Sequence, residues 1–200
     1  MFTGLVEDVG TIEQVRVTPA GRELRVRCRY DDLGEGESIA LDGACLTVRE
    51  HGAAWFTVAA VSTTLDRTTI GDWAEGRRVN LERAMRADAR FGGHLVLGHV
   101  DGLGAVEDIQ TAGDARIVDI TIPEELGELM VPHGSLTVDG VSLTVNDLPS
   151  PNVVQLSLIE YTRSHTTLGD LRVGQRVQIE GDVIGKYARR MLAPYQNARD

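Results

Sequence analysis

The chain has 200 residues, which suits one large domain or two domains of about 100 residues each. Charged residues make up 25% and hydrophobic residues 42%, a globular composition that argues against wholesale disorder. Thirty acidic against twenty basic residues leave a formal charge of −10, which disfavours nucleic-acid binding because phosphates would be repelled.

Alternating apolar and charged residues predict β-strands along most of the chain. In residues 22–30, Leu24, Val26 and Cys28 fall on one face and charged residues on the other, the period of a half-buried strand. Residues rich in β-branched side chains predict further strands at 55–61, 77–81, 117–122, 153–159 and 176–179. Turn-forming residues separate them at 34–36, Asp42-Gly43, His51-Gly52, Asp139-Gly140 and 149–152. This spacing favours small antiparallel barrels or sandwiches.

Two segments have helical signals. Pro123 and the two glutamates after it are typical of the first turn of a short helix, predicted at 123–130. Residues 183–192 place apolar side chains at helical spacing, with basic residues near the end. Since this second helix follows the last strand, its apolar stripe must cover a barrel end or meet another subunit.

Targeting and metal-binding signals are absent from the sequence. The apolar runs fall short of the ~20 residues that span a bilayer, and the first residues lack the features of a secretory signal. Cys28 and Cys45 have no paired spacing, so we expect reduced thiols in a cytoplasmic protein. The five histidines do not supply zinc-ligand spacing with these cysteines, so we expect no metal.

The chain repeats itself at three places in the same order. Residues 38–48 match 135–145, residues 68–82 match 166–180, and residues 1–15 match 95–109 more weakly. The offsets keep register with only small insertions. The repeat predicts two copies of one β-domain, at 1–94 and 95–182, followed by a helix and tail at 183–200.

The two copies differ at positions that matter for chemistry. Cys45 aligns with Ser142, Leu5 with His99, and Ala84 with Asp182. The second copy therefore holds more groups that exchange protons, while the first holds the candidate thiol nucleophile. A doubled pocket suits two related ligands or one pseudo-symmetric ligand, although duplication can also simply enlarge a scaffold.

Four motifs resemble those of riboflavin synthase of the α-chain type. They are MFTGLVE at 1–7, DGACLTV at 42–48, GGHLVLGHVDG at 92–102 and DGVSLTV at 139–145. The resemblance extends over essentially the whole chain. It implies an all-β fold of two tandem six-stranded antiparallel Greek-key β-barrels, with a C-terminal α-helix that joins two others in a homotrimer.

The resemblance also implies a reaction. Each barrel would bind one 6,7-dimethyl-8-ribityllumazine, and the active site would form between the first barrel of one subunit and the second barrel of a neighbour. One lumazine would give a four-carbon unit to the other, yielding riboflavin and 5-amino-6-ribitylamino-pyrimidinedione. No metal, flavin or nicotinamide cofactor would be needed. Whether the protein associates with a lumazine synthase capsid is left open.

Four side chains are candidates for catalysis. His99 suits proton transfer near neutral pH. Cys45 either adds to the ring or only shapes the pocket, and Ser142 either acts at the substrate or bonds within its strand. Asp182 either orients a neighbour's Cys45 or caps the following helix. His94, in the junction between the copies, is expected to be structural.

Substrate contacts are carried over from the family motif by motif. The first pocket would use Gly4, Leu5, Val6, Cys45, Leu46, Thr47, Ala59, Ala60, Val61, Ser62, Thr63 and Thr64. The second would use Gly98, His99, Val100, Ser142, Leu143, Thr144, Leu158, Ile159, Glu160, Tyr161, Thr162 and Arg163, and further contacts would come from Ser38 and His133.

The chain departs from the family pattern near the ligand rim. His133 stands where Lys is common, residues 159–162 lack the expected Pro, and residues 61–64 lack a Pro-Glu-Thr-type segment. These departures concern contacts to the ribityl chain more than the fold.

A non-catalytic lumazine or flavin carrier of the same fold is the alternative function. Such carriers keep one pocket and let the other decay, whereas both Leu-Thr signatures, Cys45 and His99 are intact here, which favours an enzyme. A flavin-dependent reductase would need a nucleotide-binding domain, and Gly102-Leu103-Gly104 lacks the rest of that glycine-rich fingerprint.

Overall fold

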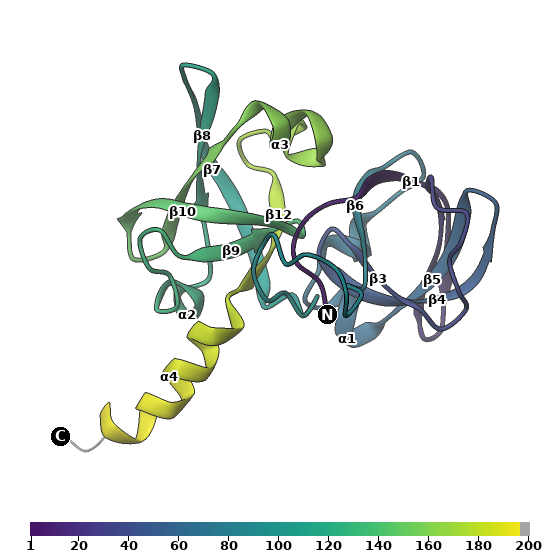
Figure 1. The fold of residues 1–200 in the computed structure, drawn as a ribbon, viewed down its shortest axis with the longest axis horizontal. Helices are drawn as coiled ribbons and strands as arrows, with labels where there is room; N and C mark the ends of the chain where they lie inside the picture. The colour runs from purple at the N-terminus through teal and green to yellow at the C-terminus, as the bar shows by residue number, and fades with distance from the viewer. Residues whose placement is uncertain (197–200) are drawn as a thin grey trace.

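The computed structural model describes residues 1–196 and shows two β-barrels, with a helix that extends from the second (Figure 1). The first barrel consists of β1 (Asp8–Thr18), β2 (Gly21–Arg27), β3 (Ser38–Leu41), β4 (Ala44–Gly52), β5 (Trp55–Val61) and β6 (Arg78–Arg83). The second consists of β7 (Gly102–Ala112), β8 (Ala115–Thr121), β9 (Ser135–Val138), β10 (Val141–Ser150), β11 (Val153–Leu158) and β12 (Arg176–Gly181).

Both barrels have the same antiparallel topology. The strand order around the first is β1-β2-β5-β4-β3-β6, and the second repeats this order with each strand number raised by six. Each barrel closes on itself, which leaves no sheet edge open to another chain. The predicted fold of two six-stranded Greek-key barrels with a C-terminal helix is therefore confirmed.

The β-bulges repeat as well as the strands. The pairing of β1 with β2 shifts between Ile12 and Gln14, and that of β7 with β8 shifts at the matching place, between Val106 and Asp108. Strands β4 and β10 also carry bulges at equivalent positions. Because a bulge sets local twist and bending, the two barrels share their detailed shape as well as their connectivity.

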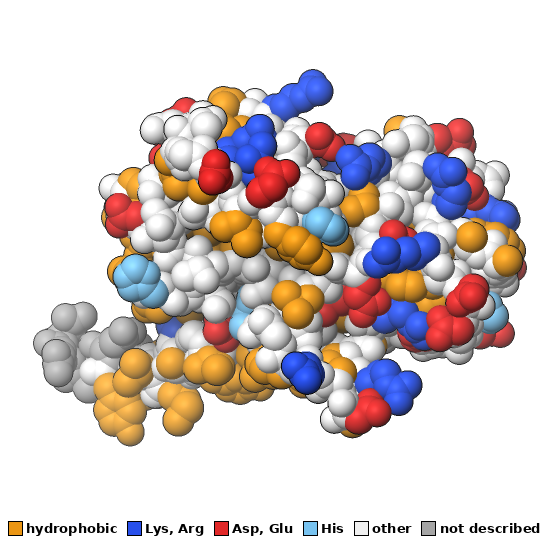
Figure 2. Space-filling model, turned by 45° about the horizontal axis from the view of Figure 1, so that its top comes forward, with side chains coloured by type: hydrophobic (Ala, Val, Ile, Leu, Met, Phe, Trp, Pro, Cys, Tyr) orange, Lys and Arg blue, Asp and Glu red, His pale blue; other side chains and the backbone are white. Residues whose placement is uncertain are grey.

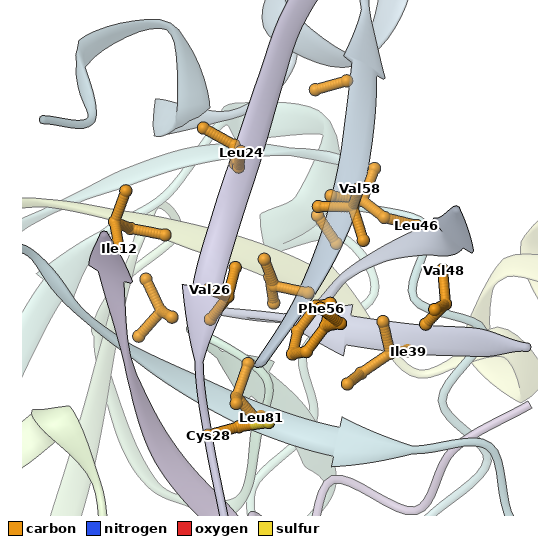
Figure 3. Packing of buried hydrophobic residues seen from close by; sticks show 14 of the residues in the cluster. Ile12, Leu24, Val26, Cys28, Ile39, Leu46, Val48, Phe56, Val58 and Leu81 are labelled. Atoms are coloured by element: carbon orange, nitrogen blue, oxygen red, sulfur yellow. The ribbon is translucent and has the colours of Figure 1, made fainter. Parts of the chain in front are cut away.

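Each barrel has its own hydrophobic core, built from the inward residues of alternating strands. Leu24, Val26, Phe56 and Leu81 are fully buried in the first barrel (Figure 3). Cys28 completes the predicted inner face of the strand after Leu24 and Val26, and it is also buried. Removing a side chain such as Phe56 from this core costs about 3–5 kcal/mol by the usual cavity penalty.

Tight turns fall where the local chemistry predicts them, with one exception. Asp42 and Gly43 both have positive φ, 44° and 83°, as the twisted two-residue turn of a β-hairpin requires, and Asp139-Gly140 repeats this geometry. The turn predicted at His51-Gly52 is wrong. Those residues belong to β4 and pair with Phe56 and Trp55 of β5, because cross-strand register places the turn two residues later.

Short helical segments cap the barrels. They are α1 (Ser62–Leu65), η1 (Thr69–Asp72), α2 (Glu124–Gly127), α3 (Glu160–His165) and η2 (Thr167–Asp170). Helix α2 is shorter than the segment predicted at 123–130, because the chain turns at residues 128–129 and the last N–H groups bond three residues back instead of four. The predicted strands differ from the observed ones only at their ends. The boundary between residues 94 and 95 stays a prediction.

The C-terminal helix α4 (Val183–Gln196) projects away from both barrels (Figure 1). Its first half is tied to the second barrel by an ion pair of 2.6 Å between Lys186 and Asp101. Ile184, Tyr187 and Met191 are nevertheless exposed, and Figure 2 shows hydrophobic side chains gathered beside the grey C-terminal end. Residues 197–200 of the predicted tail lie outside the described residues. Among the residues that are described, no helix is long and apolar enough to cross a bilayer.

Candidate active site

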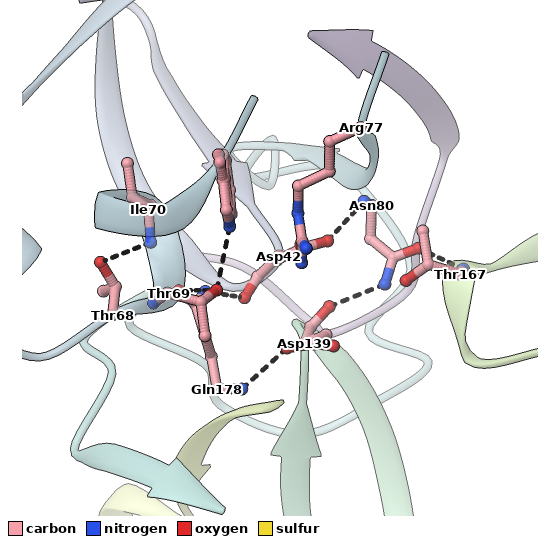
Figure 4. Close-up of polar contacts among 10 residues, drawn as sticks. Asp42, Thr68, Thr69, Ile70, Arg77, Asn80, Asp139, Thr167 and Gln178 are labelled. Carbon is pink, nitrogen blue, oxygen red and sulfur yellow. Dashed lines mark hydrogen bonds and ion pairs between the residues drawn. The ribbon is translucent and has the colours of Figure 1, made fainter. Parts of the chain in front are cut away.

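A buried polar network joins the two barrels about a pseudo-twofold axis (Figure 4). The Asn80 side chain donates to the Asp139 carbonyl at 2.9 Å, and the Gln178 side chain donates to the Asp42 carbonyl at 2.5 Å. The carboxylates of Asp42 and Asp139 each accept the backbone N–H of the β6 or β12 residue beside them, at 2.7 Å. These buried bonds fix the orientation of one barrel to the other, because each bond from Asn80 has a counterpart from Gln178 across the axis.

The turns at the axis touch through their glycines. A Cβ placed on Gly43 would lie 2.8 Å from the Gly140 nitrogen, so only glycine permits this approach. The two aspartates differ in their charge partners: Arg77 lies 3.1 Å from Asp42, whereas the matching position beside Asp139 is Gln175. Burial raises the pKa of both carboxyl groups, and Asp139 has the weaker compensation because Arg77 bonds to Asp42.

Two buried glutamates anchor the segments that lead into the barrels. Glu82 of β6 accepts the backbone N–H groups of Thr3 and Gly4 at 2.7 and 2.9 Å. Glu180 of β12 accepts those of Leu97 and His99 at 2.8 and 2.9 Å. Burial raises the pKa of both carboxyl groups, while the amide donors oppose it. His99 therefore sits on a segment with a fixed backbone.

The leading segments cross over to the opposite barrel. Phe2 pairs with Val96 as an antiparallel bridge, and beyond it the Gly98 carbonyl accepts the Cys45 N–H at 2.8 Å. In the mirror contact, the Gly4 carbonyl accepts the Ser142 N–H, also at 2.8 Å. The expected grouping of pocket residues is wrong in this respect: residues 98–100 lie against the first barrel, and residue 4 lies against the second.

A cavity of about 320 Å³ lies at the crossing on the first barrel, and its size suits a small heterocycle. It combines a thiol, an imidazole, a guanidinium and three threonine hydroxyls, and it is lined by Ala44, Cys45, Thr63, Thr64, Arg67, Thr68, Gly98, His99 and Val100. Of the predicted residues, Cys45, Thr63, Thr64 and residues 98–100 come together here. Arg67 and Thr68 were not predicted.

The second crossing brings two residues together that the sequence keeps 48 positions apart. His94 Nδ1 lies 2.8 Å from Ser142 Oγ. His94 is buried, its Nε2 has no partner among the described residues, and burial lowers the pKa of its imidazole despite the nearby Asp182 carboxylate. A neutral imidazole bonded to a hydroxyl can act as a general base. The contact joins His94, expected to be structural, to the candidate Ser142, and no spacing in the sequence indicates it.

The remaining candidates fall into three groups. Asp182 Oδ1 accepts the Ile184 N–H at 2.9 Å, which is the helix-capping alternative. The side chains of Leu46, Ala60, Leu143 and Leu158 pack in the barrel cores, so these residues offer a ligand mainly their backbone. The third group is half-buried or exposed and consists of Leu5, Val6, Ser38, Thr47, Ala59, Val61, Ser62, His133, Thr144, Ile159, Glu160, Tyr161, Thr162 and Arg163.

A larger cavity of about 510 Å³ lies between the first residues and the loop after β6. Its arginines are largely committed: Arg83 bonds Glu37 and Asp32, and Arg86 bonds Asp88. Of the predicted site residues, only Leu5 lines it. Within the described part of the chain, His, Cys, Asp and Glu side chains form no cluster able to hold a metal ion.

Known proteins share both the domain and the full length of this chain. The family described as the lumazine binding domain matches residues 3–84 and 97–182. The riboflavin synthase of Bacillus subtilis (strain 168) is 42% identical over 96% of this chain and 90% of its own, and that of Brucella abortus (strain 2308) is 40% identical over 98% and 100%. The chain belongs to the riboflavin synthase family.

Solved structures agree with this family at the level of the fold. LumP complexed with riboflavin has a TM-score of 0.80 at 22% identity, covering 90% of this chain and 99% of that one. LumP complexed with 6,7-dimethyl-8-(1'-D-ribityl) lumazine has a TM-score of 0.77 at the same identity and coverage. The family model and the relatives confirm the resemblance to riboflavin synthase seen in the sequence motifs, and the solved structures confirm its fold.

Proposed function

We propose that this chain is a riboflavin synthase, an enzyme that dismutates two molecules of 6,7-dimethyl-8-ribityllumazine into riboflavin and 5-amino-6-ribitylamino-pyrimidinedione. The observation that carries the proposal is the pair of crossings, because the cavity beside Cys45 is built from both copies of the repeat and the matching backbone contact is made at Ser142. Two like sites related by a pseudo-twofold axis suit two like ligands. Holding two reactants in the reactive orientation replaces a bimolecular encounter and can lower the activation free energy by ~7–11 kcal/mol.

The proposed roles follow the chemistry at each crossing. One lumazine loses a proton from its 7-methyl group, and the ring delocalises the resulting carbanion. His99, at the cavity that contains Cys45, takes this proton. The partner lumazine is attacked at ring position 7 by a nucleophile, for which Cys45, Ser142 or a water bonded to Ser142 are the candidates. His94 supports the last two by accepting a proton at Nδ1.

The test of this proposal is direct. Purified protein is mixed with 6,7-dimethyl-8-ribityllumazine alone, and flavin absorbance is followed. We expect one riboflavin to form for every two lumazines consumed. Tight binding without flavin formation would instead support the carrier function; LumP complexed with the same lumazine shows this fold with the ligand bound.

The proposal includes a homotrimer joined through α4, with each active site between the first barrel of one subunit and the second barrel of another. Ile184, Tyr187 and Met191 are 64, 68 and 71% exposed on a helix that leaves the barrels, which supports a role in contact between subunits. Association with lumazine synthase and a cytoplasmic location stay predictions.

Assembly and turnover are tested together. Deleting residues 183–200 is expected to give monomers whose barrels remain folded but whose turnover is lost. Mass in solution, far-UV circular dichroism and activity are measured on the same sample. A milder variant, Tyr187→Ser with Met191→Ser, checks that lost activity follows lost assembly, and an active monomer would contradict a site shared between subunits.

A further inference from the structure

Arg67 is a cation without a protein partner at the first cavity. It follows α1, lines the cavity together with Cys45 and His99, and is exposed. Its guanidinium makes no side-chain hydrogen bond or ion pair to any residue that the structure describes. Other arginines of the first barrel, such as Arg77 and Arg83, are bonded to carboxylates.

The neighbours of Arg67 add hydrogen-bonding capacity. Thr63 and Thr64 line the same wall, and Thr68 is held by its hydroxyl, which donates to the Thr64 carbonyl at 2.7 Å. This hydrogen bond stabilises the helical turn that carries Arg67. A guanidinium with five N–H donors beside hydroxyl groups is a good arrangement for recognising paired oxygen atoms of an anion.

The second barrel lacks this feature at the matching position. There His165 replaces Arg67, stacks on Tyr161 with ring centroids 4.0 Å apart, and lies 2.9 Å from the Tyr161 carbonyl. The nearby Arg163 is paired with Glu160 at 3.3 Å. At the matching position of the second barrel the His165 ring is therefore engaged by its own helix, whereas the Arg67 guanidinium is bonded to no residue that the structure describes.

The overall charge sharpens this difference. A chain with a net charge of −10 repels anions at long range. An unpaired cation in a cavity counters that repulsion locally, where a ligand would sit.

We propose that Arg67 forms a cationic subsite for an anionic group on the ligand of the first pocket. The proposal rests on the proposed function, because it takes the ligand to be a ribityl heterocycle. The anion has two possible sources: a phosphate ester on the ribityl chain, or the ring of a lumazine that has lost a proton. Arg67 is thereby a residue that makes the two pockets unequal in ligand preference.

The first arm of the experiment tests the phosphate. Riboflavin and flavin mononucleotide are titrated into the full-length protein at pH 7 and low salt, and flavin fluorescence is recorded. If the phosphate is the source, the unaltered protein binds flavin mononucleotide at least ~10-fold more tightly at one site, and Arg67→Gln removes this preference. Arg67→Lys keeps part of it, and Arg172→Gln, which removes an exposed arginine outside the cavity, keeps all of it.

The second arm tests the deprotonated ring. The KM for 6,7-dimethyl-8-ribityllumazine is measured from pH 6 to pH 9 with the same variants. If the ring anion is the source, KM falls as pH rises in the unaltered protein and in Arg172→Gln, and this dependence disappears in Arg67→Gln.

The two arms distinguish a failure of the Arg67 subsite from a failure of the proposed enzyme function. A preference in either arm that depends on Arg67 supports the cationic subsite and identifies its source. Riboflavin binding and turnover that are indifferent to Arg67→Gln in both arms overturn the subsite and leave the enzyme proposal intact. Failure of all three ligands to bind overturns both.

Discussion

The two barrels share their strand topology and the bonds that join them across the axis, and they differ at positions proposed to contact a ligand. Strand order, bulges, hairpin turns and the Asn80–Asp139 and Gln178–Asp42 bonds are repeated across the axis. By contrast, the first copy has Cys45 where the second has Ser142, and Arg67 where the second has His165. The proposed reaction needs such an arrangement, because the symmetric scaffold brings two identical substrates together. The differing side chains then make one the donor and the other the acceptor of the four-carbon unit.

The largest expected effect concerns the glycine contact on the axis. Gly43→Ala adds a Cβ 2.8 Å from the Gly140 nitrogen at a φ of 83°, so both strain and a backbone clash oppose folding. We expect a loss of more than about 3 kcal/mol in the free energy of unfolding, measured by urea denaturation. Gly76→Ala is the matched control, with a φ of 87° and no atom within 4 Å of its Cβ, and should lose about 1 kcal/mol. Equal losses would show that the barrels do not depend on this contact.

The second prediction compares the histidines at the two crossings. His99→Gln and His94→Gln are each expected to lower kcat about 10²-fold with a smaller change in KM, because each removes a proton-transfer group. His51→Gln, an exposed position on β4, is the control and should be unaffected. Unchanged turnover in either variant would remove that histidine from the mechanism, and a fall in one alone would assign proton transfer to one pocket.

The smallest effects distinguish the two buried aspartates. Asp42→Asn leaves Arg77 without its carboxylate and should cost about 1–3 kcal/mol, the range being lower than for a fully buried pair because Arg77 is partly exposed. Asp139→Asn keeps an oxygen for the Gln178 N–H and removes no ion pair, so it should change stability by less than about 1 kcal/mol at pH 5. Urea denaturation of both variants measures the difference, and equal costs would contradict the assigned asymmetry.

The Asp139 variant also has a pH signature. Burial raises the pKa of Asp139 in the folded protein above the unfolded value of about 3.9. The folded protein then keeps a proton that the unfolded chain releases, so this group's contribution falls as pH rises from about 4 to the folded pKa. Asp139→Asn abolishes that loss, and its stability relative to the unaltered protein should therefore rise with pH across this window. A constant difference would show that Asp139 is ionised when folded.

Local chemistry predicted strands and hairpin turns, and the internal repeat predicted two β-domains, whereas the six-stranded Greek-key barrels came from the family resemblance and the pockets could not be predicted. The turn at Asp42-Gly43 follows from residues that tolerate positive φ, and the buried face of β2 follows from its period of two. The prediction of a turn at His51-Gly52 is wrong because pairing of these residues with β5 outweighs their turn propensity.

The crossings could not be found in the same way. Residues 1–5 and 94–99 are equally good partners for either barrel in the sequence, so only the folded chain shows that Gly98 bonds Cys45 and that Gly4 bonds Ser142. The contact between His94 and Ser142 depends on this exchange, and it was missed for the same reason.

The exchange of leading segments also bears on how such a chain arises. A symmetric dimer of single-barrel proteins would trade the same segments between its two copies, as domain-swapped dimers do. Joining two such copies in one chain preserves the exchange of segments and allows each half to acquire its own mutations. The present asymmetry at Arg67 and Ser142 is what that freedom permits, and the exchange predicts that a half produced separately completes its pocket only by pairing with a second copy of itself.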